Sequence, residues 1–217
     1  MNRKQLIKLI EDGENLTVEF KQRFSDHEKI AKEIIAFANT RGGILLFGID
    51  DNGKIRGVES EKEVAELVKE TLTYYCEPQL NHEFSFINIK EKEIVVLTIF
   101  ESKTKPHSLQ NFHNNLSPNT ERVYIRVKDK SVPASKEMIK LLQTRTNEKK
   151  LKNYSIGKNE QMVFQYLDEN DFITAKKLSD LANLSSRRAS RTLINLVRAN
   201  ILAIHTKENG EDYFSTF

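Results

Sequence analysis

Residues 36–53 most constrain the fold, because they join the end of a helix to a buried strand and a tight turn. Apolar residues recur at helical spacing from 30 to 38, and the Gly42-Gly43 pair then ends the helix, since glycine readily adopts the left-handed conformation of helix ends. Residues 44–49 are nearly all apolar, which is typical of a strand buried on both faces. Asp-Asp-Asn-Gly at 50–53 favours a hairpin turn. The sequence therefore predicts a buried strand that delivers two carboxylates to a turn.

Shorter periodic segments around this one alternate between helical and strand spacing, which predicts a mixed α/β (α+β) first domain. Residues 102–120 lack periodicity and predict a long loop. The helices are expected at residues 4–11, 26–39, 64–75 and from 133, and the strands at 16–20, 44–49, 55–58, 84–89, 94–100 and 122–128.

The pattern changes after residue 142. Residues 143–159 are rich in lysine, have no sustained period, and are interpreted as a basic linker between a first domain at 1–142 and a second at 160–217. The second domain shows three short helical patterns and then two short strands around Glu208-Asn209-Gly210. This order resembles a winged helix-turn-helix, with residues 186–199 as its recognition helix.

Composition narrows the class of protein. The chain has 217 residues, a net charge of +3 and one cysteine, so an internal disulfide is excluded. Cys76 follows a helical pattern and is expected to be a buried structural thiol. The longest apolar runs are too short to span a membrane. We therefore expect a cytoplasmic protein without a membrane partner.

Several motifs resemble one family. They are Glu14-Asn-Leu-Thr-Val-Glu-Phe-Lys21, Ala36-Phe-Ala-Asn-Thr-Arg-Gly-Gly43, Gly48-Ile-Asp-Asp51, Lys105-Pro106-His107 and Tyr124-Ile-Arg-Val-Lys-Asp-Lys-Ser-Val-Pro-Ala134. Together they resemble the Schlafen AlbA-2 domain, once labelled divergent AAA-4, over roughly the first two-thirds of the chain. One departure is Lys128, where members of that family more often have glycine.

The resemblance also implies a set of acidic residues. Glu14, Glu19 and Asp51 match the acidic triplet of the Schlafen proteins that cleave RNA. Clustered carboxylates can hold Mg²⁺ or Mn²⁺ ions that activate a nucleophile. The alternative interpretation is that these acids are solvated in a turn and on a strand face.

The predicted recognition helix carries the other candidate site. Arg188, Arg191 and Asn195 share one face opposite the apolar stripe, and Arg187 and Thr192 flank them. Arginine can bind guanine or phosphate through its forked donors, and asparagine can pair with adenine. The alternative is a solvated face on a domain that binds protein. Acidic residues near Lys207 in the predicted wing would repel phosphates.

One segment matches the spacing of a nucleotide-binding motif but lacks a residue that the motif requires. Residues 48–54 satisfy G-x-x-x-x-G-K, but Ile55 stands where the motif requires Ser or Thr, and no helix is predicted to follow. A hairpin turn is the better interpretation. Histidines and the single cysteine do not show zinc-ligand spacing.

These patterns lead to one main hypothesis and two alternatives. The main hypothesis is a DNA-binding transcriptional regulator that acts as a homodimer and needs no cofactor, with RNA as another possible ligand. The first alternative is a metal-dependent endoribonuclease centred on the three acidic residues. The second is a scaffold whose winged helix binds protein.

Overall fold

The computed structural model describes residues 1–110, 122–146 and 155–217, and these form two compact units. The first unit is Met1–Pro133 and the second is Ala134–Phe217. Part of the predicted long loop and the middle of the predicted linker lie outside the described residues. Helices and strands are interleaved in the first unit, which confirms its predicted mixed α+β class.

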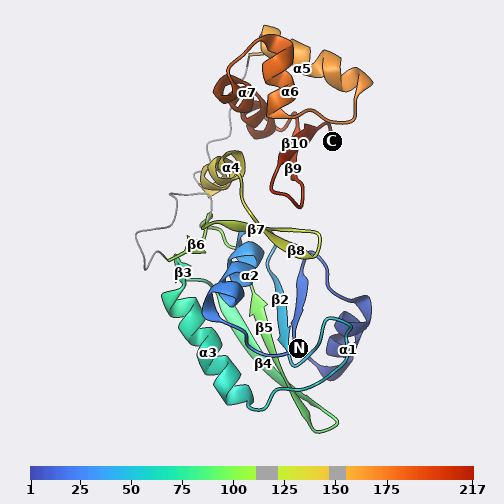
Figure 1. Ribbon diagram of the computed structural model, residues 1–217, viewed down its shortest axis with the longest axis vertical. Helices are drawn as coiled ribbons and strands as arrows, with labels where there is room; N and C mark the ends of the chain where they lie inside the picture. The colour runs from blue at the N-terminus through green and yellow to red at the C-terminus, as the bar shows by residue number, and fades with distance from the viewer. Residues whose placement is uncertain (111–121, 147–154) are drawn as a thin grey trace. The chain divides into compact units, whose positions relative to one another are not determined.

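A four-stranded sheet forms the centre of the first unit (Figure 1). Its order is β1-β2-β5-β4, with β1 parallel to β2 and the other neighbours antiparallel. The strands are β1 (Val18–Lys21), β2 (Gly43–Phe47), β4 (His82–Ile89) and β5 (Lys92–Ile99). Helix α2 (His27–Asn39) connects β1 to β2, as a parallel pair requires.

Helices cover both faces of this sheet. One face packs against α2 and α3 (Glu61–Tyr74), where Leu45 and Leu97 are fully buried. The other face contacts α1 (Arg3–Asp12), where Leu6 packs with Leu46 and Val96. The predicted strand buried on both faces is therefore confirmed for β2.

The two glycines after α2 have different physical roles. Gly42 has φ +74°, and its N–H donates to the carbonyl of Phe37 over 2.8 Å, which ends the helix. Gly43 has no such backbone requirement. A Cβ atom on Gly43 would lie 2.2 Å from Cδ1 of Phe37, so only glycine leaves room for that ring.

The turn after β2 lies at the predicted position, but the strand expected after it is not formed. The N–H of Gly53 donates to the carbonyl of Asp50 over 2.8 Å, and Gly53 has φ +77°. Residues 55–58 were expected to form a strand, but they form only a bridge between Ile49 and Ile55 and another between Val58 and Glu93. Gly48 and Gly57, with φ of +95° and +80°, turn the backbone out of the extended conformation that a longer ladder needs.

The first unit also contains two small antiparallel sheets of two strands each. The strands β7 (Tyr124–Val127) and β8 (Lys130–Pro133) form one, and β3 (Cys76–Glu77) and β6 (Ser108–Leu109) form the other. The expected strand at 122–128 corresponds to β7. Lys128, in the turn between β7 and β8, has φ +54°, which explains physically why glycine suits this position.

Asn39 fastens the β3–β6 and β7–β8 regions to α2. Its amide nitrogen donates to the carbonyls of His107 and Tyr124, each over 2.9 Å, and its oxygen accepts from the His107 N–H over 2.8 Å. Lys105 donates to the carbonyl of Thr40 at the end of α2 over 2.8 Å. The Lys105-Pro106-His107 motif therefore has a structural role.

Two titratable side chains of this unit, those of His107 and Cys76, are buried. The His107 ring bonds to the Pro78 carbonyl and the Ser102 hydroxyl, and burial lowers its pKa. Burial also raises the pKa of the Cys76 thiol to about 12. The expected structural role of Cys76 is confirmed.

The second unit consists of helices and one hairpin. In chain order these are α4 (Lys136–Thr146), α5 (Lys158–Glu169), α6 (Ala175–Ala182), α7 (Ser186–Arg198), β9 (Ala203–Thr206) and β10 (Asp212–Ser215). Thr174 caps α6 by accepting from the Lys177 N–H over 3.2 Å, as expected. Ile173 forms a bridge to Phe214, so the segment before α6 joins the hairpin.

The boundary between the units differs from the one predicted at residue 142. Helix α4 belongs to the second unit, because Leu141 is part of its core and Met138 packs against that core. The core of this unit also contains Val163, Leu178, Leu193 and Phe214.

Among the described helices, none is both long and apolar enough to cross a membrane.

Replacing Asn39 with alanine should destabilise the first unit by at least about 3 kcal/mol, because three buried backbone groups would lose their partner. Urea unfolding followed by circular dichroism measures this change. Asn81→Ala is the control, since Asn81 is exposed and should change stability by less than about 0.5 kcal/mol. Equal stability of the two variants would contradict the role of Asn39.

Replacing Lys128 with glycine should stabilise the protein by about 0.5–1 kcal/mol, because the relief of left-handed strain exceeds the added entropy of the unfolded chain. Lys130→Gly, in the extended strand β8 of the same hairpin, should instead be destabilising. Thermal unfolding of the two variants beside the wild type checks both signs.

Candidate functional site

Helix α7 presents a strongly basic face. Arg187, Arg188 and Arg191 are exposed, and residues 187–198 contain four arginines and no acid. In the described part of the chain, the side chains of Arg187 and Arg191 have no ion-pair partner. Asn195 is half-buried on the same helix. The sequence-predicted arginines are therefore available to an anionic ligand.

Thr192 does not share this surface. Only 8% of the residue is exposed, and it lies among the core positions of α7 with Leu193 and Leu196. The sequence placed Thr192 beside the basic face, and its burial removes it from the candidate contact residues. Thr192 lies at the border of the apolar stripe, where helical spacing alone does not show whether a residue is buried or exposed.

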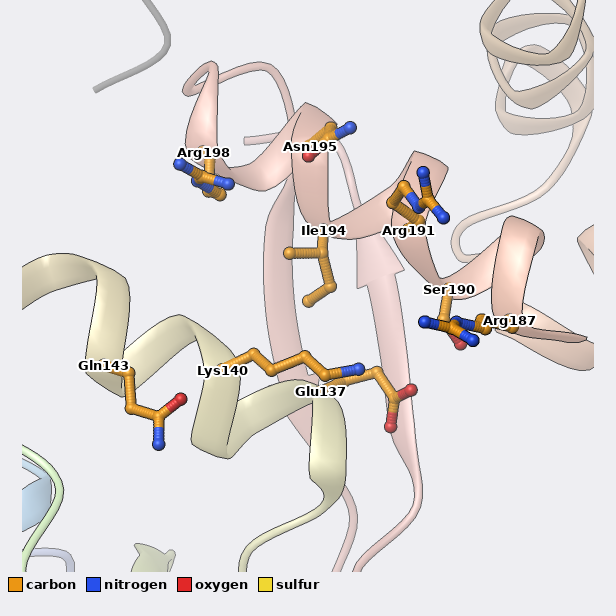
Figure 2. A pocket seen from close by; sticks show the side chains of 9 residues that line it. All are labelled: Glu137, Lys140, Gln143, Arg187, Ser190, Arg191, Ile194, Asn195 and Arg198. Carbon is orange, nitrogen blue, oxygen red and sulfur yellow. The ribbon is translucent and has the colours of Figure 1, made fainter. Parts of the chain in front are cut away.

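A groove of about 510 Å³ runs between α4 and α7 (Figure 2). The Ile194 side chain points from α7 toward α4, and the Lys140 side chain extends along the space between the two helices. Arg188 does not line the groove, so the arginines of α7 divide between two directions. The lining residues are Glu137, Lys140, Gln143, Arg187, Ser190, Arg191, Ile194, Asn195 and Arg198.

Hydrogen bonds fix the start of α4 to the hairpin of the second unit. The Ser135 hydroxyl accepts from the Met138 N–H over 2.9 Å and donates to a carboxylate oxygen of Asp212 on β10. The other oxygen of Asp212 accepts from the Thr206 hydroxyl over 2.7 Å. Burial raises the pKa of Asp212. These contacts hold one wall of the groove in place.

The hairpin itself adds little positive charge. Lys207 pairs with Glu211 over 3.1 Å, and its ammonium lies 5.6 Å from the centre of the Phe172 ring. The hairpin is acidic, as expected, and its Lys207 is paired with one of the acids. The arginines of α7, by contrast, lie on a helix whose residues 187–198 include no acid.

The three acidic residues of the alternative site lie in the first unit. One oxygen of Glu14 accepts from the Phe20 N–H over 2.8 Å. Burial raises the pKa of Glu14, and the charges of Glu19 and Asp51 raise it further. Glu14 therefore lies close enough to Glu19 and Asp51 to be affected by their charges.

Basic side chains already occupy the carboxylate of Glu19 in this structure. Both oxygens of Glu19 are engaged, one by Lys21 and the other by Arg126 over 3.0 Å. Within residues 1–110, 122–146 and 155–217, no group of three His, Cys, Asp or Glu side chains is placed to hold a metal ion. The donor set therefore does not fit the divalent cation that a three-carboxylate nuclease needs.

Arg126 is the residue of this region that the sequence reasoning missed. Its side chain is fully buried and donates to Glu33 over 2.8 Å, to Glu19 over 3.0 Å and to the Asn15 carbonyl over 2.9 Å. Its guanidinium lies 4.7 Å from the centre of the Phe37 ring. Alternation along β7 places Arg126 on the same face as buried Tyr124, and this alternation was the available signal.

Glu33 completes this network from α2. It accepts from Arg126 and from the Ser131 hydroxyl. Burial raises the pKa of Glu33, and the charge of Glu19 raises it further. A fully desolvated cation is thus shared between two carboxylates, which is a structural arrangement and not an open catalytic one.

Comparison with known families identifies the first unit. The profile of the family described as "Schlafen, AlbA_2" matches residues 14–135, which is more than half of the chain. The chain belongs to the Schlafen AlbA_2 family. The match includes Glu14, Glu19, Asn39, Asp51 and Arg126.

One curated relative matches part of this Schlafen AlbA_2 protein. An uncharacterized ATP-binding protein of Ureaplasma parvum is 36% identical over 87 residues, which is 37% of this chain and 24% of that protein. The chain thus corresponds to about a quarter of the length of this curated relative. In the present chain, residues 48–54 form a turn and the next helix begins only at Glu61.

Two solved structures show a limited likeness. One is the N-terminal domain of a protein from Nitrosomonas europaea described as related to the ATP-dependent DNA helicase RecG, with 24% identity, a TM-score of 0.43, and coverage of 55% of this chain and 86% of that one. The other is the DIP2311 protein of Corynebacterium diphtheriae, with 21% identity, a TM-score of 0.43, and coverage of 62% and 31%. With TM-scores this low, neither supports a conclusion about this chain.

Replacing Arg126 with methionine should destabilise the protein by about 3–5 kcal/mol at neutral pH, because two buried carboxylates lose their cation. Without the cation, the native state of the variant should bind a proton at Glu33 more readily than the unfolded state does. Its stability should therefore rise as the pH falls from neutral toward the ordinary glutamate range near 4.5.

Urea unfolding at pH 7 and pH 5.5 tests this expectation. Arg56→Met is the control, because Arg56 is largely exposed and pairs with Asp50 at the surface. The control should stay close to wild type at both pH values. A variant of Arg126 that is equally unstable at both pH values would contradict the ionic role.

Proposed function

We propose that this Schlafen AlbA_2 protein is a DNA-binding transcriptional regulator of the cytoplasm and that α7 is its DNA-reading helix. The observation that carries the proposal is the set of exposed arginines on α7, whose residues 187–198 include no acid. Phosphate neutralisation by such side chains supplies most of the affinity of nucleic-acid-binding proteins. Arg188, Arg191 and Asn195 are the proposed contacts to phosphates and bases, and Arg187 adds a flanking charge.

The order of elements in the second unit supports this role. Helices α5, α6 and α7 precede the β9–β10 hairpin, which is the order of a winged helix-turn-helix. With 13 residues, α7 is about 20 Å long and of suitable size for the major groove. Arginine and asparagine on one helix face provide donors for guanine, adenine and phosphate.

We further propose a homodimer as the binding species. A single recognition helix reads only a few base pairs, and regulators of this kind commonly pair two helices across a two-fold axis. RNA is the second possible ligand, since the same arginines can bind its phosphates. Binding to duplex DNA and to single-stranded RNA, compared at several salt concentrations, separates the two ligands.

The nuclease and scaffold alternatives are not part of the proposal. Glu19 is engaged by Lys21 and Arg126, so no specific observation favours a catalytic metal among the acidic residues. A scaffold that binds only protein would show no salt-dependent affinity for DNA. Cleavage of RNA by the purified protein in Mg²⁺ or Mn²⁺ would contradict the regulator.

Replacing both Arg188 and Arg191 with alanine should weaken DNA binding and flatten its salt dependence. If each arginine neutralises one phosphate, the slope of log K against log salt should fall by about 2. Fluorescence anisotropy with a labelled duplex measures both quantities. Lys4→Ala/Lys8→Ala is the matched control, because it removes two exposed charges from α1. An unchanged slope in the folded arginine variant would remove α7 from the binding surface.

A further inference from the structure

The groove between α4 and α7 contains more positive charge than a helix–helix contact needs. Among the residues that the structure describes, its walls supply one cation from α4, Lys140, three from α7, Arg187, Arg191 and Arg198, and one carboxylate, Glu137. Arg187 and Arg191 are one helical turn apart on α7, so their like charges repel one another, and a bound anion relieves that repulsion. The charge pattern therefore favours a ligand with several negative charges.

The groove also has the size of a small-molecule site. Its volume of about 510 Å³ lies inside the range of about 300–1,000 Å³ found for ligand pockets. Ile194 gives it an apolar floor, and Ser190 and Asn195 offer hydrogen-bonding groups beside the cations (Figure 2). A ligand can therefore be oriented as well as attracted.

We infer that the groove between α4 and α7 binds a small phosphorylated molecule. A phosphate group carries nearly two negative charges and three acceptor oxygens, which suits a groove lined by several cations better than a single carboxylate does. The forked donors of arginine bind phosphate through two parallel hydrogen bonds, and Lys140 adds a point charge from the opposite wall.

Occupation of the groove should also control binding to DNA, and this part rests on the proposed function. Arg191 lines the groove and belongs to the proposed DNA-reading face, so one guanidinium cannot serve both ligands fully. A small phosphorylated ligand and DNA therefore compete. The ligand acts as an effector that releases the regulator from its operator.

Calorimetric titration of the full chain with inorganic pyrophosphate, at constant ionic strength and without DNA, tests the site itself. The wild type should bind pyrophosphate saturably. Lys140→Gln should weaken binding by about tenfold or more, because a charge-assisted contact is lost. Lys136→Gln, which removes an exposed lysine of the same helix that does not line the groove, should bind as the wild type does.

Absence of pyrophosphate binding, or equal loss in both variants, would overturn the site. Circular dichroism establishes that each variant is folded. Because this arm contains no DNA, its outcome does not depend on the proposed regulatory function.

A second arm adds labelled duplex DNA. Pyrophosphate should lower the affinity of the wild type and of Lys136→Gln for DNA, and the same concentration should have much less effect on Lys140→Gln. Equal effects on all three proteins would overturn the competition. Failure of the wild type to bind DNA in the absence of pyrophosphate would count against the proposed function, while the first arm would still decide the ligand site.

Discussion

The charge of Arg126 has no access to water, and the arrangement of the first unit depends on how that charge is balanced. Glu19 on β1 and Glu33 on α2 accept from its guanidinium, and its backbone N–H donates to the Thr40 hydroxyl over 2.9 Å. The β7–β8 hairpin forms no ladder with the main sheet. Its attachment therefore relies on this polar network together with the contacts of Asn39, and apolar packing alone would leave its position less specific.

The parts of the fold that the sequence predicted are those governed by local constraints. Apolar spacing identified α2 and β2, and the helix end at Gly42 was predicted because Gly42 has a positive φ. The role of Gly43, which leaves space beside Phe37, was not predicted. Local constraints also identified α6, whose Thr174 cap and apolar stripe are close in sequence. Exposed arginines on α7 were also predictable, since a helix with one apolar stripe turns its opposite face to water.

The parts that were not predicted depend on residues far apart in sequence. Glu19 was read as an acid on a polar strand face, because nothing in residues 16–21 reveals its partner at position 126. Helix α4 has an apolar pattern that suits either core, so its assignment to the second unit could not be read from periodicity. Thr192 lies at the margin of its stripe, where one residue position separates core from surface.

The distance along the chain between Arg126 and its acids sets an order of events during synthesis. Arg126 and Glu19 are separated by 107 positions, and Asn39 and Tyr124 by 85. At about 5–20 residues per second, a ribosome needs roughly 5 to 20 seconds to cover the longer interval. During that time the nascent β1–α2–β2 segment has hydrated carboxylates where the finished protein has a buried ion pair. These hydrated charges lie beside the apolar residues of β1 and α2 and so oppose aggregation until the arginine emerges.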